Sequence, residues 1–301
     1  MLNTPVSKLI SVIPDVVSIL GDYSSISINS VMPIGEADEN SLSWIRADIV
    51  NKIEIANSTK AGLVICEESG DIDFSIYATN KKCFVITKNA KLAVIRIVEL
   101  IYPKQKSGIH ESVVIASNAR IGLNVTIGPN SNIGDSFIGD NVKIGMNCII
   151  HDRVCISNGA FIHDNSIIGG EGFNYVKDNL GISIKFPYIG GVEIGSNVEI
   201  GSFSYISSGV LGKTKIDSGA KIGQYCYIGG NVFIGLNTHI RTRSTICGSA
   251  KVGTEVMIAP AVTIRDDISI GNNSIIGMGS IVTKNVPSGE TWYGNPATKR
   301  K

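Results

Sequence analysis

The feature that most constrains the fold is an isoleucine or valine that recurs at every sixth residue, without a miss, between residues 216 and 282. A period of six is neither the helical period of about 3.6 nor the strand period of about 2. It is typical of repeats in which a short strand and a turn form one side of a triangular coil. These anchor positions are Ile216, Ile222, Ile228, Ile234, Ile240, Ile246, Val252, Ile258, Ile264, Ile270, Ile276 and Val282.

The residue four positions after each anchor is small or of medium size, as in Ala220, Cys226 and Ser244. Large and small residues that both point inward fill a narrow three-sided prism at close packing. Glycine and asparagine are common between anchors, where the corners of the prism need positive φ. We therefore predict a left-handed parallel β-helix.

Similar hexads precede this run. Their anchors fall at every sixth residue over 109–133, over 138–168 after a deletion of one residue, and over 194–206. Together with the unbroken run they make 26 hexads. That number corresponds to about eight or nine coils, and at a strand spacing of about 4.8 Å the prism is about 40 Å long. We place the β-helix domain at 106–290 and a C-terminal tail at 291–301.

The hexads break at residues 169–191, which we interpret as a long loop that leaves the solenoid. Insertions in repeat proteins gather on a binding face, and long loops often carry function. In one interpretation the aromatic residues Phe173, Tyr175, Phe186 and Tyr188 cover a bound substrate. In the other, the loop packs on a neighbouring subunit. The two interpretations are compatible.

Residues 1–105 lack the hexad, and we interpret them as a small α/β domain. The apolar runs 61–66 and 83–87 predict buried strands. Asn89 predicts the N-cap of a helix that extends to Tyr102. The buried side of this helix is expected to comprise Leu92, Ile95, Val98, Leu100 and Ile101.

Composition argues against several classes of protein. The formal net charge is +1 and the basic residues cluster only at 299–301, which argues against a nucleic-acid partner. No apolar run approaches the roughly 18 residues of a membrane span. Lys8, Pro14 and Asp15 interrupt the apolar stretch that a secretory signal would need. The six cysteines form no CxxC pair, so we expect structural thiols, no metal and a cytoplasmic location.

The isoleucine ladder and the ending Gly294-Asn-Pro-Ala297 are similar to the hexapeptide acyltransferases. Ser166-Ile-Ile-Gly-Gly-Glu-Gly-Phe-Asn-Tyr175 and Lys185-Phe-Pro-Tyr-Ile-Gly-Gly-Val-Glu-Ile-Gly195 resemble the loop of the UDP-3-O-(3-hydroxyacyl)glucosamine N-acyltransferase family. The resemblance covers residues 109–301. It implies a homotrimer with active sites between neighbouring prisms.

The N-terminal domain also resembles the nucleotide-binding domain of that family. Its segment Leu42-Ser-Trp-Ile45 places Trp44 at the position of the aromatic ring that stacks on the uracil. Stacking a base on an indole ring is physically favourable. The resemblance therefore implies that Trp44 contacts a nucleotide-linked substrate.

The chain departs from the pattern of that family at the catalytic hexad. The family's Ile-Ala-His-Asn is here Ile228-Gly-Gly-Asn231, so that Gly230 replaces the histidine and Asn231 remains. The family's helical C-terminal extension, associated with acyl carrier protein, has no counterpart, and the Gly-Asn-Pro-Ala ending instead resembles enzymes that use acyl-coenzyme A. These departures favour N-acyl transfer from acyl-coenzyme A to a UDP- or dTDP-linked deoxyamino sugar for O-antigen or another surface glycan. A lipid A type enzyme that depends on acyl carrier protein is the alternative.

Amide formation from a thioester needs a neutral amine, a held carbonyl group and a donor for the oxyanion. The backbone N–H of Gly230 is the candidate donor. His151 and His163 each follow an anchor by one position, and Ile150-His-Asp152 resembles the histidine hexad of acetyltransferases that act on bacillosamine-type sugars. Each histidine is either a base or the partner of a solvent or intersubunit hydrogen bond. We hypothesise that no strong base replaces the missing histidine and that the enzyme relies on positioning.

The superfamily resemblance places coenzyme A in a groove beside the late coils and implies contacts with Gly277, Gly279, Ser280 and Lys284. Three other functions fit the sequence less well. A zinc site of the γ-carbonic anhydrase kind needs three converging histidines, and the chain has four in all. A non-catalytic scaffold subunit would explain the lost histidine but not the aromatic loop. O-acylation needs a base more than N-acylation does, because an alcohol is the poorer nucleophile.

Overall fold

The computed structural model describes residues 3–46, 48–68, 72–79, 81–102 and 108–300. The chain separates into two compact units, residues 1–105 and 106–301. The domain boundary expected between residues 105 and 106 lies within 103–107, outside the described residues.

The N-terminal unit is built on a five-stranded sheet with the order β2-β7-β6-β5-β4. Strands β4 to β7 run parallel, and β2 pairs antiparallel with β7 at one edge. Strand β7 is buried throughout because apolar clusters cover both faces of the sheet. A separate antiparallel pair joins β1 and β3. The strands are β1 (Thr4–Pro5), β2 (Val16–Leu20), β3 (Ser27–Ile28), β4 (Ser30–Val31), β5 (Ser41–Ile45), β6 (Leu63–Glu67) and β7 (Cys83–Thr87).

Three α-helices and one 3-10 helix accompany this sheet: α1 (Val6–Ile10), α2 (Lys52–Ser58), η1 (Phe74–Tyr77) and α3 (Ala90–Ile101). The side chain of Asn89 caps α3 by accepting a hydrogen bond from the N–H of Leu92 at 2.9 Å, as predicted. The predicted buried side is wrong in part, since Ile95 is 45% exposed. Ala93 and Ile97 face the core instead, because small residues let the helix lie close to the sheet. None of the described helices is long and apolar enough to cross a membrane.

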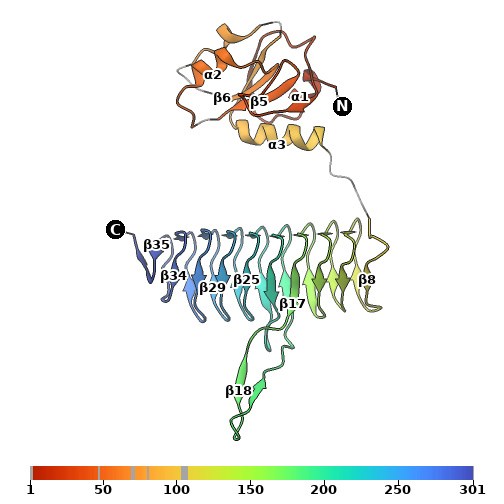
Figure 1. The fold of residues 1–301 in the computed structure, drawn as a ribbon, viewed down its shortest axis with the longest axis vertical. Helices are drawn as coiled ribbons and strands as arrows, with labels where there is room; N and C mark the ends of the chain where they lie inside the picture. The colour runs from red at the N-terminus through yellow and green to blue at the C-terminus, as the bar shows by residue number, and fades with distance from the viewer. Residues whose placement is uncertain (1–2, 47, 69–71, 80, 103–107, 301) are drawn as a thin grey trace. The chain divides into compact units, whose positions relative to one another are not determined.

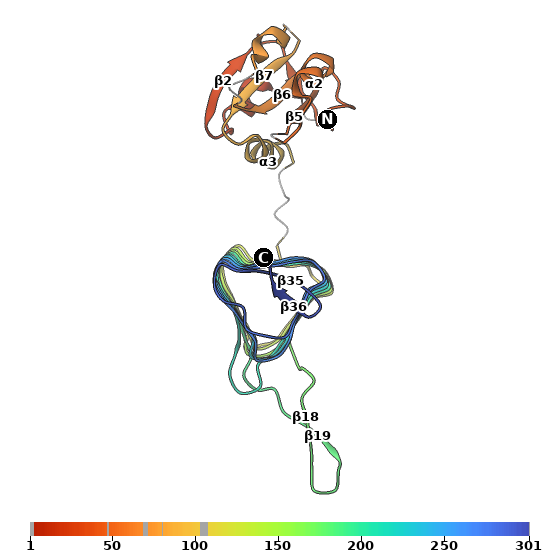
Figure 2. The ribbon, with the colours of Figure 1, turned by 90° about the vertical axis from the view of Figure 1, so that its left-hand side faces the viewer.

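The second unit is a parallel β-solenoid of three sheets, with the triangular cross-section seen in Figure 2 and the stacked coils seen in Figure 1. We name the sheets face A, face B and face C. Face A contains β10 (Thr126–Ile127), β13 (Lys143–Ile144), β16 (Phe161–Ile162), β21 (Glu199–Ile200), β24 (Lys221–Ile222), β27 (His239–Ile240), β30 (Met257–Ile258) and β33 (Ile275–Ile276), followed by β35 (Thr291–Gly294) and β36 (Ala297–Lys299).

Face B contains β8 (Val114–Ile115), β11 (Asn132–Ile133), β14 (Ile149–Ile150), β17 (Ile167–Gly170), β22 (Tyr205–Ser207), β25 (Tyr227–Ile228), β28 (Thr245–Ile246), β31 (Thr263–Ile264) and β34 (Ile281–Val282). Face C contains β9 (Arg120–Ile121), β12 (Phe137–Ile138), β15 (Val154–Ile156), β20 (Val192–Ile194), β23 (Thr214–Ile216), β26 (Phe233–Ile234), β29 (Lys251–Val252) and β32 (Ser269–Ile270). The chain visits the faces in the order B, C, A. The corners are named after the faces that they join.

The hexad pattern accounts for the interior of the solenoid. The anchors and the smaller residues four positions later form one continuous core. Where the smaller residue is polar and another coil follows, its hydroxyl donates to a backbone carbonyl of that coil, as Ser204 does to Gly223 at 3.0 Å and Thr238 to Gly253 at 2.7 Å. The first anchors Ile109 and Ile115 are 45% and 36% exposed, because no earlier coil covers them.

Two segments extend the regular coils. The antiparallel hairpin of β18 (Tyr175–Lys177) and β19 (Ser183–Lys185) lies within the 169–191 loop and projects from the solenoid (Figure 1). The C-terminal tail folds back on the last coil, where Trp292 pairs with Ile276 and Ala297 is buried. The tail therefore covers the end of the core, as terminal caps do in repeat proteins.

Candidate functional site

The B–C corner is irregular in two successive coils and returns to a direct turn in the coil after them. The 169–191 loop follows β17, a shorter excursion over 208–213 follows β22, and a direct turn through Gly229 and Gly230 follows β25. Figure 2 shows the long loop leaving the solenoid at one corner of the triangle. The two excursions and the turn with the missing histidine thus share one edge of the solenoid, which we take as the candidate active site.

The bases of the two excursions are bonded to each other. The N–H of Ile189 donates to the carbonyl of Val210 at 2.8 Å, and the N–H of Gly190 donates to the carbonyl of Gly209 at 3.0 Å. A Cβ atom at Gly190 would collide with the carbonyl of Gly212. Only glycine allows this close approach of two backbones, so the base of the long loop is held in one place.

Gly230 lies directly beneath the base of the long loop. A Cβ atom there would lie 2.7 Å from the carbonyl oxygen of Ser208 and 3.2 Å from Cε1 of Tyr188. The first of these distances is well inside van der Waals contact. A histidine therefore does not fit at position 230 unless the loop moves, and the ring of Tyr188 lies beside the space that its side chain would need.

The N–H of Gly230 has no hydrogen-bond partner among the described residues. At the same position of an earlier B–C turn, the N–H of Asp135 donates to Oδ1 of Asp152 in the following coil, at 2.8 Å. The coil that follows Gly230 presents Gly248 there, which has no side chain to accept. The donor expected for the oxyanion is therefore free to bind a ligand oxygen.

Asn231 supports the shorter excursion. Its Oδ1 accepts a hydrogen bond from the N–H of Val210 at 2.9 Å, and its own N–H donates to Oγ1 of Thr214 at 2.9 Å. Its φ of +61° lies in the left-handed region that asparagine tolerates. These contacts give Asn231 a structural function, and its predicted catalytic role stays a prediction.

His151 lies on the same corner, one coil before the long loop. A Cβ atom at Gly169, where the loop begins, would lie 3.2 Å from the Cβ of His151. The neighbouring Asp152 is not its partner, because Oδ1 of Asp152 accepts from Asp135. The imidazole is exposed and has no hydrogen-bond partner in the described part of the chain.

His163 lies on the A–B corner, so the strand β17 separates it from the start of the loop. Its Nε2 lies 2.8 Å from Oε1 of Glu199, and its ring stacks on Phe161 with the centroids 3.9 Å apart. The adjacent Asp164 accepts instead from the N–H of Met146. Glu199 was not predicted as the partner, because the long loop places it 36 residues away along the chain although it lies in the next coil.

Phe173 and Tyr175 lie at the beginning of the projecting hairpin. Their ring centroids are 4.9 Å apart, and the side chains are 89% and 44% exposed. The apolar residues Leu180 and Ile182 of the hairpin are exposed as well. A two-stranded hairpin is marginally stable in water without a covering surface. This segment is therefore suited to pack on a substrate or on another subunit.

Trp44 lines a cavity of about 500 Å³ in the N-terminal unit. The cavity lies where β5 and β6 end and α3 begins, and Arg46, Glu67 and Lys91 also line it. The carboxyl ends of parallel strands are a common place for ligands. One side of the Trp44 ring packs on the core, and the residue remains partly exposed.

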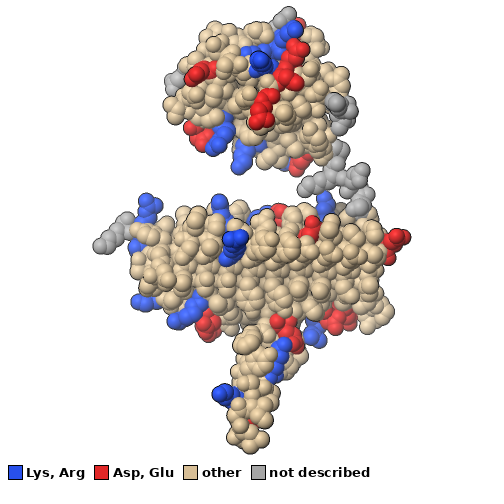
Figure 3. Space-filling model, in the orientation of Figure 1, with Lys and Arg blue, Asp and Glu red and all other residues tan. Residues whose placement is uncertain are grey.

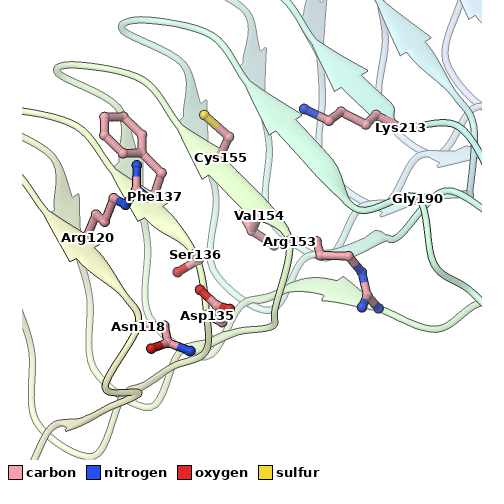
Figure 4. A pocket seen from close by; sticks show the side chains of 10 residues that line it. All are labelled: Asn118, Arg120, Asp135, Ser136, Phe137, Arg153, Val154, Cys155, Gly190 and Lys213. Carbon is pink, nitrogen blue, oxygen red and sulfur yellow. The ribbon is translucent and has the colours of Figure 1, made fainter.

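A second cavity, of about 670 Å³, lies on face C beside the B–C corner (Figure 4). The three cations Arg120, Arg153 and Lys213 line it together with one carboxylate, Asp135. Phe137 and Cys155 lie between Arg120 and Lys213 in Figure 4. This cavity was not predicted, because its residues come from coils that are distant in sequence.

The residues expected to contact coenzyme A do not share one cavity. Ser280 is buried, its hydroxyl donates to the carbonyl of Gly277 at 2.7 Å, and it accepts from the N–H of Gly294. Gly277 and Gly279 lie on the A–B corner, whereas Lys284 is exposed on the B–C corner. The late coils do carry a cavity of about 450 Å³ on face C, lined by Phe233, Lys251, Val252, Gly253, Ser269, Ile270, Gly271, Asn285, Val286, Pro287 and Ser288.

The described residues contain no group of three metal-ligating side chains that could hold an ion. All six cysteines are free thiols. Burial raises the pKa of Cys66 and of Cys83 to about 12. Those two thiols are therefore protonated at neutral pH and are unsuited to nucleophilic catalysis.

Comparisons with known proteins agree with this architecture. No family model matches the chain. The chain is 37% identical over 240 residues to UDP-3-O-acylglucosamine N-acyltransferase 1 of Francisella tularensis subsp. holarctica, a match that covers 72% of this chain and spans 66% of the relative, just under two thirds of its length. A solved UDP-N-acetylglucosamine acyltransferase from Campylobacter jejuni matches with a TM-score of 0.59 and 26% identity, over 64% of this chain and 73% of that chain.

A longer match settles the family. UDP-3-O-acylglucosamine N-acyltransferase 1 of Francisella tularensis subsp. tularensis is 37% identical to the chain over 287 residues, which cover 88% of this chain and 81% of the relative. The two proteins thus align through the N-terminal unit and the solenoid alike. The chain belongs to the UDP-3-O-acylglucosamine N-acyltransferase family.

Proposed function

We propose that the protein transfers an acyl group from acyl-coenzyme A to the amino group of a nucleotide-linked amino sugar, for the synthesis of a surface glycan. Membership of an acyltransferase family supports the reaction class. The observation that carries the proposal is the free N–H of Gly230 beneath the long loop, at the turn where the family resemblance places the catalytic histidine.

The geometry suits acylation of an amine without a strong base at position 230. A neutral amine attacks the thioester carbon, the carbonyl oxygen becomes an oxyanion, and the N–H of Gly230 donates a hydrogen bond to it. The carbon–sulfur bond then breaks, the thiolate leaves, and the proton lost by nitrogen passes through solvent to the thiolate. An alcohol would have to lose its proton earlier and would need a base more.

Trp44 is the proposed contact of the nucleotide. Its cavity of about 500 Å³ offers an indole face for a base and the positive charge of Lys91 for a phosphate group, whereas Arg46 is bonded to Asp48 in the same cavity. The relatives that align across this unit are named for a UDP-linked sugar, which favours uracil as the base. The rings of Phe173 and Tyr175 are proposed to cover the acceptor.

The donor is proposed to lie along the late coils. The mostly apolar cavity on face C suits an acyl chain or a pantetheine arm, and Lys251 at its margin suits a phosphate. The contacts implied earlier for Gly277, Gly279 and Lys284 remain proposals of the same kind. Ser280 is the weakest of them, because both hydrogen bonds of its hydroxyl lie within the chain.

A homotrimer is proposed from the chemistry of face B. The outward residue of each of its strands is uncharged, and Figure 3 shows few charged side chains on the solenoid face that carries β8, β17 and β25. Faces A and C carry charges at the corresponding positions. An uncharged face this long is suited to pack on another copy of the chain. These outward residues are Val114, Asn132, Ile149, Ile167, Tyr205, Tyr227, Thr245, Thr263 and Ile281.

The test is an incubation of the purified chain with acetyl- and 3-hydroxybutyryl-coenzyme A and a panel of UDP- and dTDP-linked amino sugars, in which thiol release is followed. We expect turnover with at least one pair. The panel also contains UDP-3-O-acylglucosamine with carrier-bound 3-hydroxyacyl groups, the pair suggested by the relatives. Turnover with that pair alone would place the enzyme in lipid A synthesis. No turnover with any pair would favour a scaffold subunit.

A further inference from the structure

The ring of Tyr188 lies beside the space that a side chain at position 230 would need. Tyr188 is 7% exposed, although it comes from a loop whose hairpin is almost entirely exposed. Its Cε1 lies 3.2 Å from the Cβ position of Gly230. The absence of a side chain at Gly230 leaves room for the Tyr188 ring at this corner.

The hydroxyl end of the ring reaches the first turn of the same loop. A Cβ atom at Gly172 would lie 2.6 Å from the Tyr188 hydroxyl and 2.9 Å from Oγ of Ser207. The Tyr188 hydroxyl has no hydrogen-bond partner within the described residues, whereas the neighbouring Tyr205 hydroxyl donates to the carbonyl of Glu171 at 2.8 Å. Because the Tyr188 oxygen is not sealed from solvent, its proton is available to a ligand oxygen that enters the corner.

The position of Tyr188 is fixed by its backbone. Its carbonyl accepts a hydrogen bond from Nη2 of Arg153 at 3.3 Å, and the next N–H, of Ile189, donates to Val210. A donor that is held before the reaction needs no reorganisation when charge develops. Burial, and next the charge of nearby Tyr227, raise the pKa of the Tyr188 phenol, so it stays protonated at neutral pH and can donate but not act as a base.

We propose that the Tyr188 hydroxyl is a second hydrogen-bond donor to the acyl carbonyl oxygen, beside the N–H of Gly230. This inference rests on the proposed function. As the amine attacks, the oxygen gains negative charge and both donors bind it; the phenol keeps its proton. The carbonyl forms again when the thiolate leaves. The loop thus places a polar group at the corner where Gly230 stands in place of the family's histidine.

The test compares Tyr188→Phe with the wild-type chain, using the donor and acceptor pair that the wild type turns over. Phenylalanine keeps the ring that packs on Gly230 and removes only the hydroxyl. We expect kcat to fall by about 10²-fold, with KM changed by less than about threefold, as for the loss of one oxyanion donor. The melting temperature is expected to stay the same. The matched control is Tyr225→Phe, which removes a hydroxyl on the A–B corner, where Tyr225 stacks on Phe203.

Three results would overturn the role proposed for the Tyr188 hydroxyl. A Tyr188→Phe enzyme that retains its kcat would show that the tyrosine is only a packing element, and the proposed function would stand. A parallel loss of kcat and of the melting temperature would also overturn the inference, because it indicates a structural role. If the wild type turns over no pair, the proposed function falls first and the inference falls with it.

Discussion

The B–C corner is built differently in the middle and in the late coils of the solenoid. In the late coils each turn bonds to the next with little variation: the N–H of Ser249 donates to Gly230 and that of Asp267 to Gly248, at 2.9 and 3.1 Å. In the middle coils two excursions interrupt this ladder and bond to each other. The regular coils therefore hold the fold together, while the irregular coils leave donors and aromatic rings free for a ligand.

This difference separates stability from activity along one solenoid. The turn at Gly230 has an unused N–H because the next coil has a glycine where others have a capping carboxylate or amide. Some variants should therefore lower activity and leave stability unchanged, and others should do the reverse.

Removal of the hairpin should have the largest effect. Replacing residues 174–185 by a short glycine–asparagine turn keeps Tyr188 but removes Tyr175 and the exposed strands. We expect kcat/KM to fall by about 10³-fold, because the loop orients the acceptor and excludes water. The melting temperature should change by less than about 3 °C, since these residues contribute nothing to the core. Full activity of the shortened protein would show that the hairpin takes no part in the reaction.

Two isoleucines allow the stability contributed by a late coil to be compared with that contributed by the hairpin. Ile246 is fully buried in a late coil, whereas Ile184 is 48% exposed on the hairpin. We expect Ile246→Ala to lower the free energy of unfolding by about 2–5 kcal/mol, because it leaves a cavity in the prism. Ile184→Ala should change it by less than about 0.5 kcal/mol. Chemical denaturation of the two variants side by side measures both values. Equal losses would mean that the hairpin is part of the stable core.

The two histidines test whether a base is used. We expect His151→Ala and His163→Ala each to lower kcat/KM by less than about tenfold, because His163 lies on the A–B corner and His151 lies three coils before the Gly230 turn. Glu199→Gln serves as the companion of His163→Ala and should behave alike, since it removes the negative charge from the same pair. A fall of about 10³-fold or more in either histidine variant would identify a base and overturn the positioning account.

The smallest effect is expected at the C-terminal cap. The pKa of Glu290 is lowered by its hydrogen bonds from Lys299 and from Trp292, at 2.6 and 2.7 Å. A carboxyl whose pKa is lower in the folded state stabilises that state above its unfolded pKa, and this contribution is lost as the pH falls through the folded pKa. Below about pH 4 we expect Trp292 fluorescence to report opening of the tail. On acidification the melting temperature of the wild type should fall further than that of Glu290→Gln, by no more than about 2 °C. An identical pH dependence of the two proteins would contradict this.

The hexads were sufficient to predict the solenoid, the inward residues and the place of the loop, because each coil repeats one local rule. What they could not predict are contacts between coils that the insertions bring into new register. The pair of His163 and Glu199 and the fit of Tyr188 against Gly230 both depend on how many residues the loop contains. The cation-lined cavity of face C is hidden for the same reason, since Arg120 and Lys213 lie four coils apart.

The N-terminal unit shows the opposite limit. Two apolar runs indicated its buried strands, but the orientation of α3 depended on the small residues Ala90 and Ala93, which a hydrophobic pattern undervalues. The match of Trp44 to a stacking position came from family resemblance. The structure adds a cavity beside it, which the sequence pattern alone could not reveal.

N-acyl transfer is tested most directly by the mass of the sugar product before and after alkaline hydroxylamine, which cleaves esters and leaves amides intact. The wild-type chain is incubated with acyl-coenzyme A and the amino-sugar nucleotide that supports thiol release. The account predicts a nucleotide sugar heavier by one acyl group, unchanged by hydroxylamine, and absent when the hairpin has been removed. A product that loses its acyl group to hydroxylamine, or no acylated sugar at all, would contradict it.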